Sequence, residues 1–166
     1  PSVFNYGGDL NRFAELIAAG DRDRLAQYAQ ACIEPLYMNA VHLNRPGLKS
    51  ITVVQGDALG GGFECALSGN VLIAERGAKM GFPEILFNLF PGMGALSLLG
   101  RRVGYQKAEQ MILSGRLYSA EELHEEALAA GVPVSLSTVY NALHQFTEAS
   151  LLRILAGAGV LDDGLV

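Results

Sequence analysis

GDALGGGFECALS, at Gly56–Ser68, and KMGFPEILFNLFPGMGA, at Lys79–Ala95, decide how this sequence folds. The first has three consecutive glycines before a short apolar run, which predicts a tight loop that opens a helix. Each stretch carries one carboxylate, Glu64 in the first and Glu84 in the second. Backbone N–H groups of such a loop can hold a developing oxyanion, and two carboxylates facing it can move protons beside a carbonyl. The two stretches therefore predict acid–base chemistry on an acyl group.

Short strands and helices alternate around these stretches. Asp9 and Asp21 are of a residue type that caps helix N-termini, and each comes directly before a pattern of helical spacing. SITVVQ, at Ser50–Gln55, is rich in β-branched residues and predicts a buried strand. We predict further strands at Val71–Ala74 and Lys79–Phe82, and further helices at Tyr105–Ser114, Ala120–Ala130 and Leu136–Phe146. The predicted fold class is α/β.

Length and composition favour one ordinary domain, or a small domain with a fragment attached. The chain has 166 residues, of which 50% are hydrophobic and 17% charged, so a sizeable core is expected. We find no apolar run long enough to cross a bilayer and no signal-peptide pattern, and we expect a cytoplasmic protein without a membrane partner. Cys32 and Cys65 have no metal-ligand spacing, so no metal site is expected. Because the chain opens on Pro1 rather than Met, we expect a fragment or a processed product.

From about Val3 to Ser119, the order of strand, glycine loop, helix and strand, followed by FPE and PGMG, resembles the crotonase (enoyl-CoA hydratase/isomerase) superfamily. The wording of GDALGGGFECALS, ERGAKMGFPEILFNLFPGMGA and AEQMILSGRLYSAEEL is most similar to its diffusible-signal-factor synthase branch. The resemblance implies a truncated ββα spiral core and an enzyme that hydrates or dehydrates acyl thioesters. That branch dehydrates a 3-hydroxyacyl thioester on acyl carrier protein and can then cleave the thioester, which would make a fatty-acid signal.

The resemblance also assigns residues. It matches Gly8 and Gly61 to the two amides of the family's oxyanion hole, and Glu64 and Glu84 to its two catalytic glutamates. It implies no cofactor beyond the coenzyme A or acyl carrier protein that carries the substrate, and it implies a homo-trimer. Which glutamate takes the α-proton and which protonates the departing hydroxyl stays open, and no substrate-binding residue is assigned. Taken singly, a triple glycine is often only a turn, and a glutamate in a first helical turn only a partner of the helix dipole.

A second resemblance begins where the first ends. HEEALAAGVPVSLSTVYNALHQFTEASLLRIL, at 124–155, is similar to the DNA-binding winged helix of the ferric uptake regulator family. It implies a helix-turn-helix-like helical segment after the α/β core and matches Tyr140 to a base-contacting tyrosine. A DNA-binding transcriptional regulator, an inactive chimaera and an ordinary amphipathic helix are therefore the alternatives to keep open for this segment.

Charge changes at the same point of the chain. Residues 1–118 hold 11 Lys and Arg against 10 Asp and Glu, a net charge of +1, whereas residues 119–166 hold one against seven, a net charge of −6. We predict a crotonase-like partial domain at 1–118, a winged-helix-like fragment at 119–156 and a tail at 157–166. Because duplex binding recruits several Lys and Arg side chains, we do not expect nucleic acid as a partner.

Several other charged or titratable side chains are expected to have no catalytic role. Arg101, Arg102 and Lys107 could meet phosphates or an acidic carrier, but a solvated helix face is the simpler interpretation. His42 matches no catalytic position of the crotonase family, and we expect a structural or solvated histidine there. His124 is expected on an exposed helix face rather than at a metal site.

Overall fold

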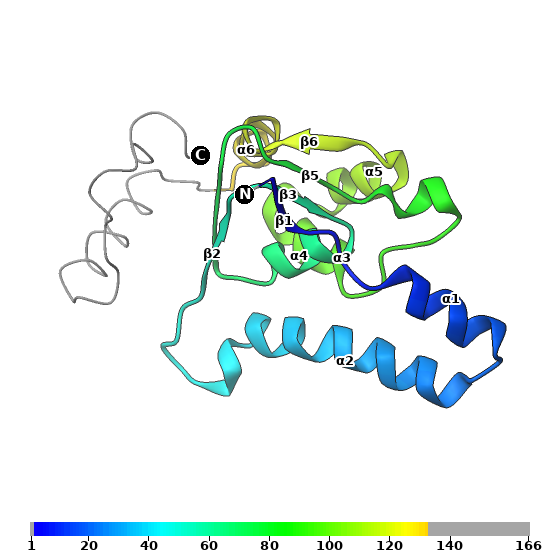
Figure 1. Cartoon of the computed structure of the whole chain (residues 1–166). Coiled ribbons are helices and arrows are strands. Elements are labelled where there is room, and N and C mark those ends of the chain that lie inside the picture. The colour runs from blue at the N-terminus through cyan, green and yellow to red at the C-terminus, as the bar shows by residue number, and fades with distance from the viewer. Residues whose placement is uncertain (1, 133–166) are drawn as a thin grey trace.

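Two small sheets carry the strands of the fold. The computed structural model describes residues 2–132, the coloured part of the chain in Figure 1. The larger sheet has the strand order β1-β3-β5-β6, with bounds of Val3–Asn5, Asp57–Leu59, Lys79–Gly81 and Leu117–Ser119. In this sheet β1, β3 and β5 run parallel, whereas β6 is antiparallel to β5. The smaller sheet pairs β2 (Ile51–Val54) in parallel with β4 (Val71–Ala74). The predicted α/β class is confirmed.

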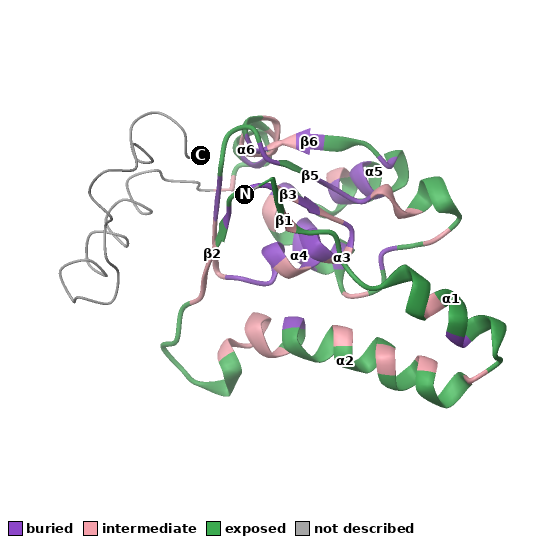
Figure 2. Cartoon of the chain, viewed as in Figure 1, coloured by how far each residue is buried: buried purple, intermediate pink, exposed green. Residues whose placement is uncertain are grey.

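The hydrophobic core lies around α3 (Gly61–Leu67), the helix that the glycine loop opens. α3 contacts β1, β2, β3 and α4. Phe63 of α3 is fully buried, and its ring lies 5.0 Å from that of Phe82, centroid to centroid. Figure 2 shows the buried residues gathered in α3, α4 and the strands beside them. The glycine loop is therefore built into the most buried part of the described chain.

The two helices predicted from aspartate caps form a hairpin beside this core. α1 spans Leu10–Ala18 and α2 spans Arg22–Ala40. The Asp9 side chain accepts hydrogen bonds from the amides at the start of α1, and the Asp21 side chain accepts one at the start of α2. Leu16 is the buried residue of α1 and Leu36 that of α2, and Figure 2 shows most of both helices exposed. Both caps are confirmed.

Three helices lie between β5 and β6, and one of them places Arg102 differently from the prediction. η2 (Pro83–Phe87) is a short 3-10 helix, and α4 (Ala95–Val103) packs against α5 (Tyr105–Ser114). Arg102 of α4 was expected on a solvated face. Instead its Nη2 donates to the carbonyl oxygens of Gly69, at 2.6 Å, and Asn70, at 3.2 Å, so this arginine ties α4 to the turn before β4.

His42 lies in the short 3-10 helix η1 (His42–Asn44) after α2. Its Nδ1 is 3.1 Å from Oδ1 of Asn70. The same Asn70 oxygen accepts the backbone amide of Ser50 at 2.9 Å. Of the two roles expected for this histidine, structural or solvated, it has the structural one, joining the end of α2 to the smaller sheet.

α6 (Ala120–Ala129) is the one element of the predicted winged-helix-like fragment that lies within the described residues. Ser119 and Glu122 form a capping box at its start. Ala120 and Ala127 are buried in the same hydrophobic cluster as α3 and α4, so α6 packs on the α/β core. The predicted helix at 136–146 and Tyr140 lie outside the described residues, and the helix-turn-helix segment stays a prediction. In the stretch 2–132, no helix has both the length and the apolar character that a membrane span needs.

Candidate active site

The two glycines matched to the oxyanion hole lie side by side. Gly8 follows β1 and Gly61 follows β3, and these strands are parallel neighbours, so both glycines emerge at the same edge of the sheet. A Cβ atom placed on Gly61 would lie 3.7 Å from the Gly8 amide nitrogen and 3.2 Å from the Gly7 Cα. The approach requires glycine at the next position too, since a Cβ on Gly62 would lie only 1.9 Å from the carbonyl oxygen of Asn5.

The local structure determines what the amides of the two glycine loops donate to. The Gly7 N–H donates to Oδ1 of Asn5 at 2.7 Å, so it is already engaged within the loop. Gly61 is the first residue of α3, a position whose N–H has no intrahelical acceptor. Gly8 and Gly61 therefore provide two neighbouring amides of the kind an oxyanion hole uses.

Glu64 lies one turn into α3 and is buried, with 1% of its surface exposed. Its Oε1 accepts hydrogen bonds from the backbone amides of Met93, at 2.8 Å, and Ala95, at 2.9 Å. Burial raises the pKa of Glu64 to about 7, the two amides oppose this rise, and the nearby Glu84 charge adds to it. A carboxyl group with a pKa near neutrality can both take and give a proton at physiological pH.

Glu84 lies on η2 and its side chain reaches the glycine loop. A Cβ on Gly60 would lie 2.5 Å from Oε1 of Glu84, so this carboxylate lies directly against the loop. Its Oε2 is buried and has no hydrogen-bond partner within residues 2–132. Burial raises the pKa of Glu84, and a hydrogen bond from its own backbone amide partly opposes the rise. The structure thus brings both predicted glutamates to the loop that holds Gly61, and Gly8 lies beside that loop.

Met93 is a residue of this site that sequence reasoning missed. Its amide holds Glu64, and its methyl carbon lies against Gly61, because a Cβ on Gly61 would lie 2.4 Å from Met93 Cε. PGMG was part of the motif that carried the resemblance, but the motif alone does not say that this amide reaches α3. Only the packing of the loop before α4 against α3 makes that contact.

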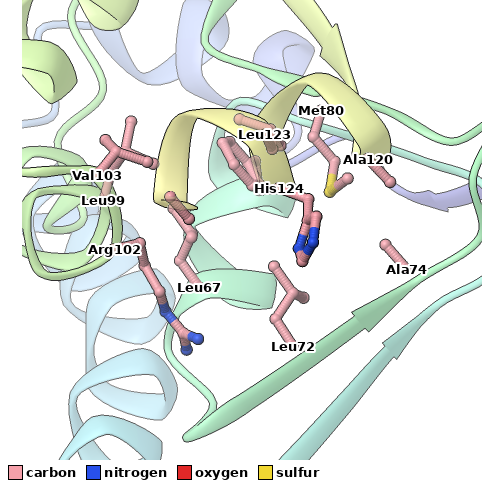
Figure 3. A pocket seen from close by; sticks show the side chains of 12 residues that line it. Leu67, Leu72, Ala74, Met80, Leu99, Arg102, Val103, Ala120, Leu123 and His124 are labelled. Atoms are coloured by element: carbon pink, nitrogen blue, oxygen red, sulfur yellow. The ribbon is translucent and has the colours of Figure 1, made fainter. Parts of the chain in front are cut away.

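A cavity elsewhere in the fold does not contain the predicted site residues. It lies beneath α6 and is lined mainly by apolar side chains, with Arg102 and His124 as its polar members (Figure 3). Phe63 of α3 lines it, whereas neither glutamate does. His124 was expected on an exposed face and is instead half-buried at this cavity. No group of three or more His, Cys, Asp or Glu in the described part of the chain is arranged to hold a metal ion.

Two carboxylates and two glycine amides, gathered at one edge of a parallel α/β core, define a site of the kind that proton transfer beside an acyl carbonyl requires. Comparison with known proteins gives the family. The family model described as enoyl-CoA hydratase/isomerase matches residues 1–151, and the chain belongs to this family. The match includes residues 124–151, which are most of the stretch that resembles the ferric uptake regulator family.

The chain is similar to curated proteins named as hydratases. It is 35% identical over 139 residues to the 2,3-dehydroadipyl-CoA hydratase of Escherichia coli. The matched region covers 82% of this chain and 50% of that protein. It is 45% identical over 130 residues to a Mycobacterium bovis protein named as a probable enoyl-CoA hydratase. This match covers 78% of this chain and 47% of that protein. The chain therefore spans about half the length of these relatives.

Solved structures give the same fold. Pseudomonas aeruginosa DspI matches with a TM-score of 0.65 and 30% identity, over 92% of this chain and 55% of that one. An enoyl-CoA hydratase/isomerase from Cupriavidus metallidurans matches with a TM-score of 0.61 and 28% identity, over 75% of this chain and 46% of that one. The crotonase-like fold of the described residues is confirmed.

Proposed function

We propose that this chain carries the acid–base site of an acyl-CoA hydratase, which adds water reversibly across the double bond of a 2-enoyl thioester. One observation carries the proposal. The carboxylates of Glu64 and Glu84 flank a single glycine loop at which the Gly8 and Gly61 amides lie side by side. Family membership and relatives named as hydratases support the same reaction class.

The glycine amides would receive the thioester oxygen. When water adds at C3 of the enoyl group, negative charge moves onto the carbonyl oxygen, and two fixed N–H donors stabilise that enolate most strongly in the transition state. Losing one donor of such a pair typically costs about 3–4 kcal/mol of transition-state stabilisation. Glycine at both positions lets the backbone approach the carbonyl closely.

The different surroundings of the two glutamates suggest different roles. Two backbone amides donate to Oε1 of Glu64, which partly offsets the effect of burial on its pKa and leaves Oε2 for a water molecule, so we assign Glu64 the removal of a proton from the attacking water. The buried Oε2 of Glu84 has no partner within the described residues, an arrangement that favours the protonated acid. We assign Glu84 the delivery of its own proton to C2, which completes the addition. Glu64 then carries the proton of the water and Glu84 is ionised, so proton exchange with solvent restores both groups before the next turnover. Dehydration is the same sequence reversed.

Finer assignments extend this proposal. We extend it to the diffusible-signal-factor synthase branch on the wording of GDALGGGFECALS and ERGAKMGFPEILFNLFPGMGA alone. In that case, the substrate would be a 3-hydroxyacyl group on acyl carrier protein, and thioester cleavage would follow its dehydration to release a fatty-acid signal. A homo-trimer and a cytoplasmic location belong to the same proposal. The DNA-binding alternative rests on Tyr140, outside the described residues, and no observation favours it.

The first test is the hydration of a trans-2-enoyl-CoA by the purified chain, followed by loss of the conjugated chromophore. Glu64→Gln and Glu84→Gln keep size and shape but cannot exchange protons, so each should lower kcat by roughly 10²–10⁴-fold. Glu109→Gln, on the exposed face of α5, is the matched control and should keep full activity. Full activity in both site variants would contradict the proposed function, as would an inactive wild-type chain.

A further inference from the structure

Tyr28 on α2 contacts the loop that holds Gly8. Its hydroxyl oxygen lies 3.4 Å from the carbonyl oxygen of Asp9, to which it donates a hydrogen bond. A Cβ atom placed on Gly8 would lie 2.8 Å from the same hydroxyl oxygen, so the phenol sits directly against Gly8. A residue twenty positions further along the chain therefore meets the loop at the glycine matched to the oxyanion hole.

This contact differs in kind from the others that fix the loop. The Gly7 amide bonds to Asn5, two residues away, and the Asp9 side chain bonds to amides two and three residues away. These bonds shape the turn but do not place it relative to the rest of the molecule. The Tyr28 hydroxyl spans nineteen residues and joins the loop to a second helix.

The hydroxyl is suited to donating this bond. Tyr28 is half-buried, and burial, followed by the neighbouring Cys32 thiol, raises its pKa. The phenol therefore stays protonated at neutral pH and keeps its donor. Tyr37 lies on the same helix with 61% of its surface exposed and offers a matched residue without such a contact.

We propose that Tyr28 is a positioning residue of the oxyanion hole, which holds the Gly8 amide beside the Gly61 amide through its hydrogen bond to Asp9 and its contact with Gly8. The inference rests on the proposed function, because the proposed function makes the Gly8 amide a donor of the oxyanion hole. Tyr28 does not touch the reacting atoms in this account. Removing its hydroxyl lets the loop shift. The shift weakens the hydrogen bond from the Gly8 amide to the enolate oxygen in the transition state more than it weakens the binding of the substrate.

Tyr28→Phe tests this directly, with Tyr37→Phe as the control. Removing an oxyanion donor outright costs about a hundredfold or more in kcat, so a misplaced donor should cost less, about tenfold, with KM within about twofold. Tyr37→Phe should leave both constants at the wild-type values. A Tyr28→Phe variant with wild-type kcat would overturn the proposal, and so would an increase in KM alone.

A double-mutant cycle of Gly8→Ala and Tyr28→Phe tests the contact between the two residues. Its backbone is not in the left-handed region, and the Tyr28 hydroxyl oxygen is the one atom that an added Cβ would crowd, since the next atoms, Cζ and Cε1 of the same ring, are at 3.7 and 4.0 Å. Gly8→Ala should therefore push the hydroxyl away in the wild type but fit in the Tyr28→Phe background. We expect the kcat loss from Gly8→Ala to be several-fold smaller in that background. Losses that simply multiply would contradict the contact.

Hydrogen exchange of the Gly8 amide separates this inference from the proposed function, because it needs no turnover. In the unliganded chain, Tyr28→Phe should raise the exchange rate of the Gly8 amide several-fold and leave that of Ile17, in α1, unchanged. Tyr37→Phe should change neither rate. If the wild type is inactive, the proposed function fails, and the Gly8 exchange rate alone decides whether Tyr28 holds the loop. An unchanged rate in Tyr28→Phe overturns the positioning role.

Discussion

The segment that carries Glu64 and the segment that carries Glu84 reach the same glycine loop from different surroundings. Glu64 is in α3, the helix that contacts both sheets, and two backbone amides of another segment hold its Oε1. Glu84 is on the short helix η2, where Leu86 and Phe87 are exposed by 67% and 63%. Within the described residues, its Oε2 has no hydrogen-bond partner.

The difference shows how the two carboxylates are positioned. Backbone contacts on several sides fix Glu64, because Gly62 packs against Asn5 and the amides of Met93 and Ala95 close over it. Glu84 depends on the contact of its side chain with Gly60, at the rim of the core. The Glu64 segment should therefore respond to change mainly through the stability of the fold, and the Glu84 segment mainly through activity.

The largest effect is expected from Gly62→Ala. An added Cβ would lie 1.9 Å from the Asn5 carbonyl oxygen, and backbone atoms cannot move aside as a flexible side chain can. We expect a loss of about 3 kcal/mol or more in the free energy of unfolding, measured by chemical denaturation. Gly77→Ala is the control, since nothing lies within 4 Å of its added Cβ. Equal stability of the two variants would show that α3 does not depend on this backbone contact.

The second effect is a pH dependence of stability that Glu64 should dominate. Its pKa rises from an ordinary 4.5 to about 7 on folding, so the native state holds this proton more tightly than the unfolded state does. The stability that Glu64 contributes is fully present below pH about 4.5 and is lost as the pH rises toward 7, by about 3 kcal/mol in total. Glu64→Gln should remove most of this fall. The measurement is the free energy of unfolding from pH 4 to 8, and an identical slope in the variant would place the dependence elsewhere.

The smallest effect is expected from Gly60→Ala and should appear in activity. Gly60 has a φ of +56°, which costs an alanine about 1 kcal/mol, and the added Cβ would lie 2.5 Å from Glu84 Oε1. The carboxylate must move, so kcat/KM should fall by about tenfold. Gly104→Ala carries the same kind of strain, at a φ of +81° with nothing within 4 Å, and should leave kcat/KM unchanged. Equal activity in the two variants would show that Glu84 tolerates displacement.

Much of the fold followed from local signals. The aspartate caps of α1 and α2 lie within three residues of the amides they accept, so sequence spacing alone places them. The strands β1, β3 and β6 were not predicted from pattern, because each is three residues long and a period of two cannot show in so short a run. Arg102 and His124 were misplaced because their burial depends on the turn before β4 and on the packing of α6.

The sequence by itself determined which residues could carry the chemistry. The triple glycine, Glu64 and Glu84 are chemical types that needed no coordinates, and local backbone preferences already place the first two at the start of a helix. Only the tertiary structure decided that Gly8 lies beside Gly61, that Met93 and Ala95 hold Glu64, and that Tyr28 reaches the Gly8 loop. These contacts join residues far apart in the chain. Their distances depend on how strands and helices pack, and no local pattern encodes them.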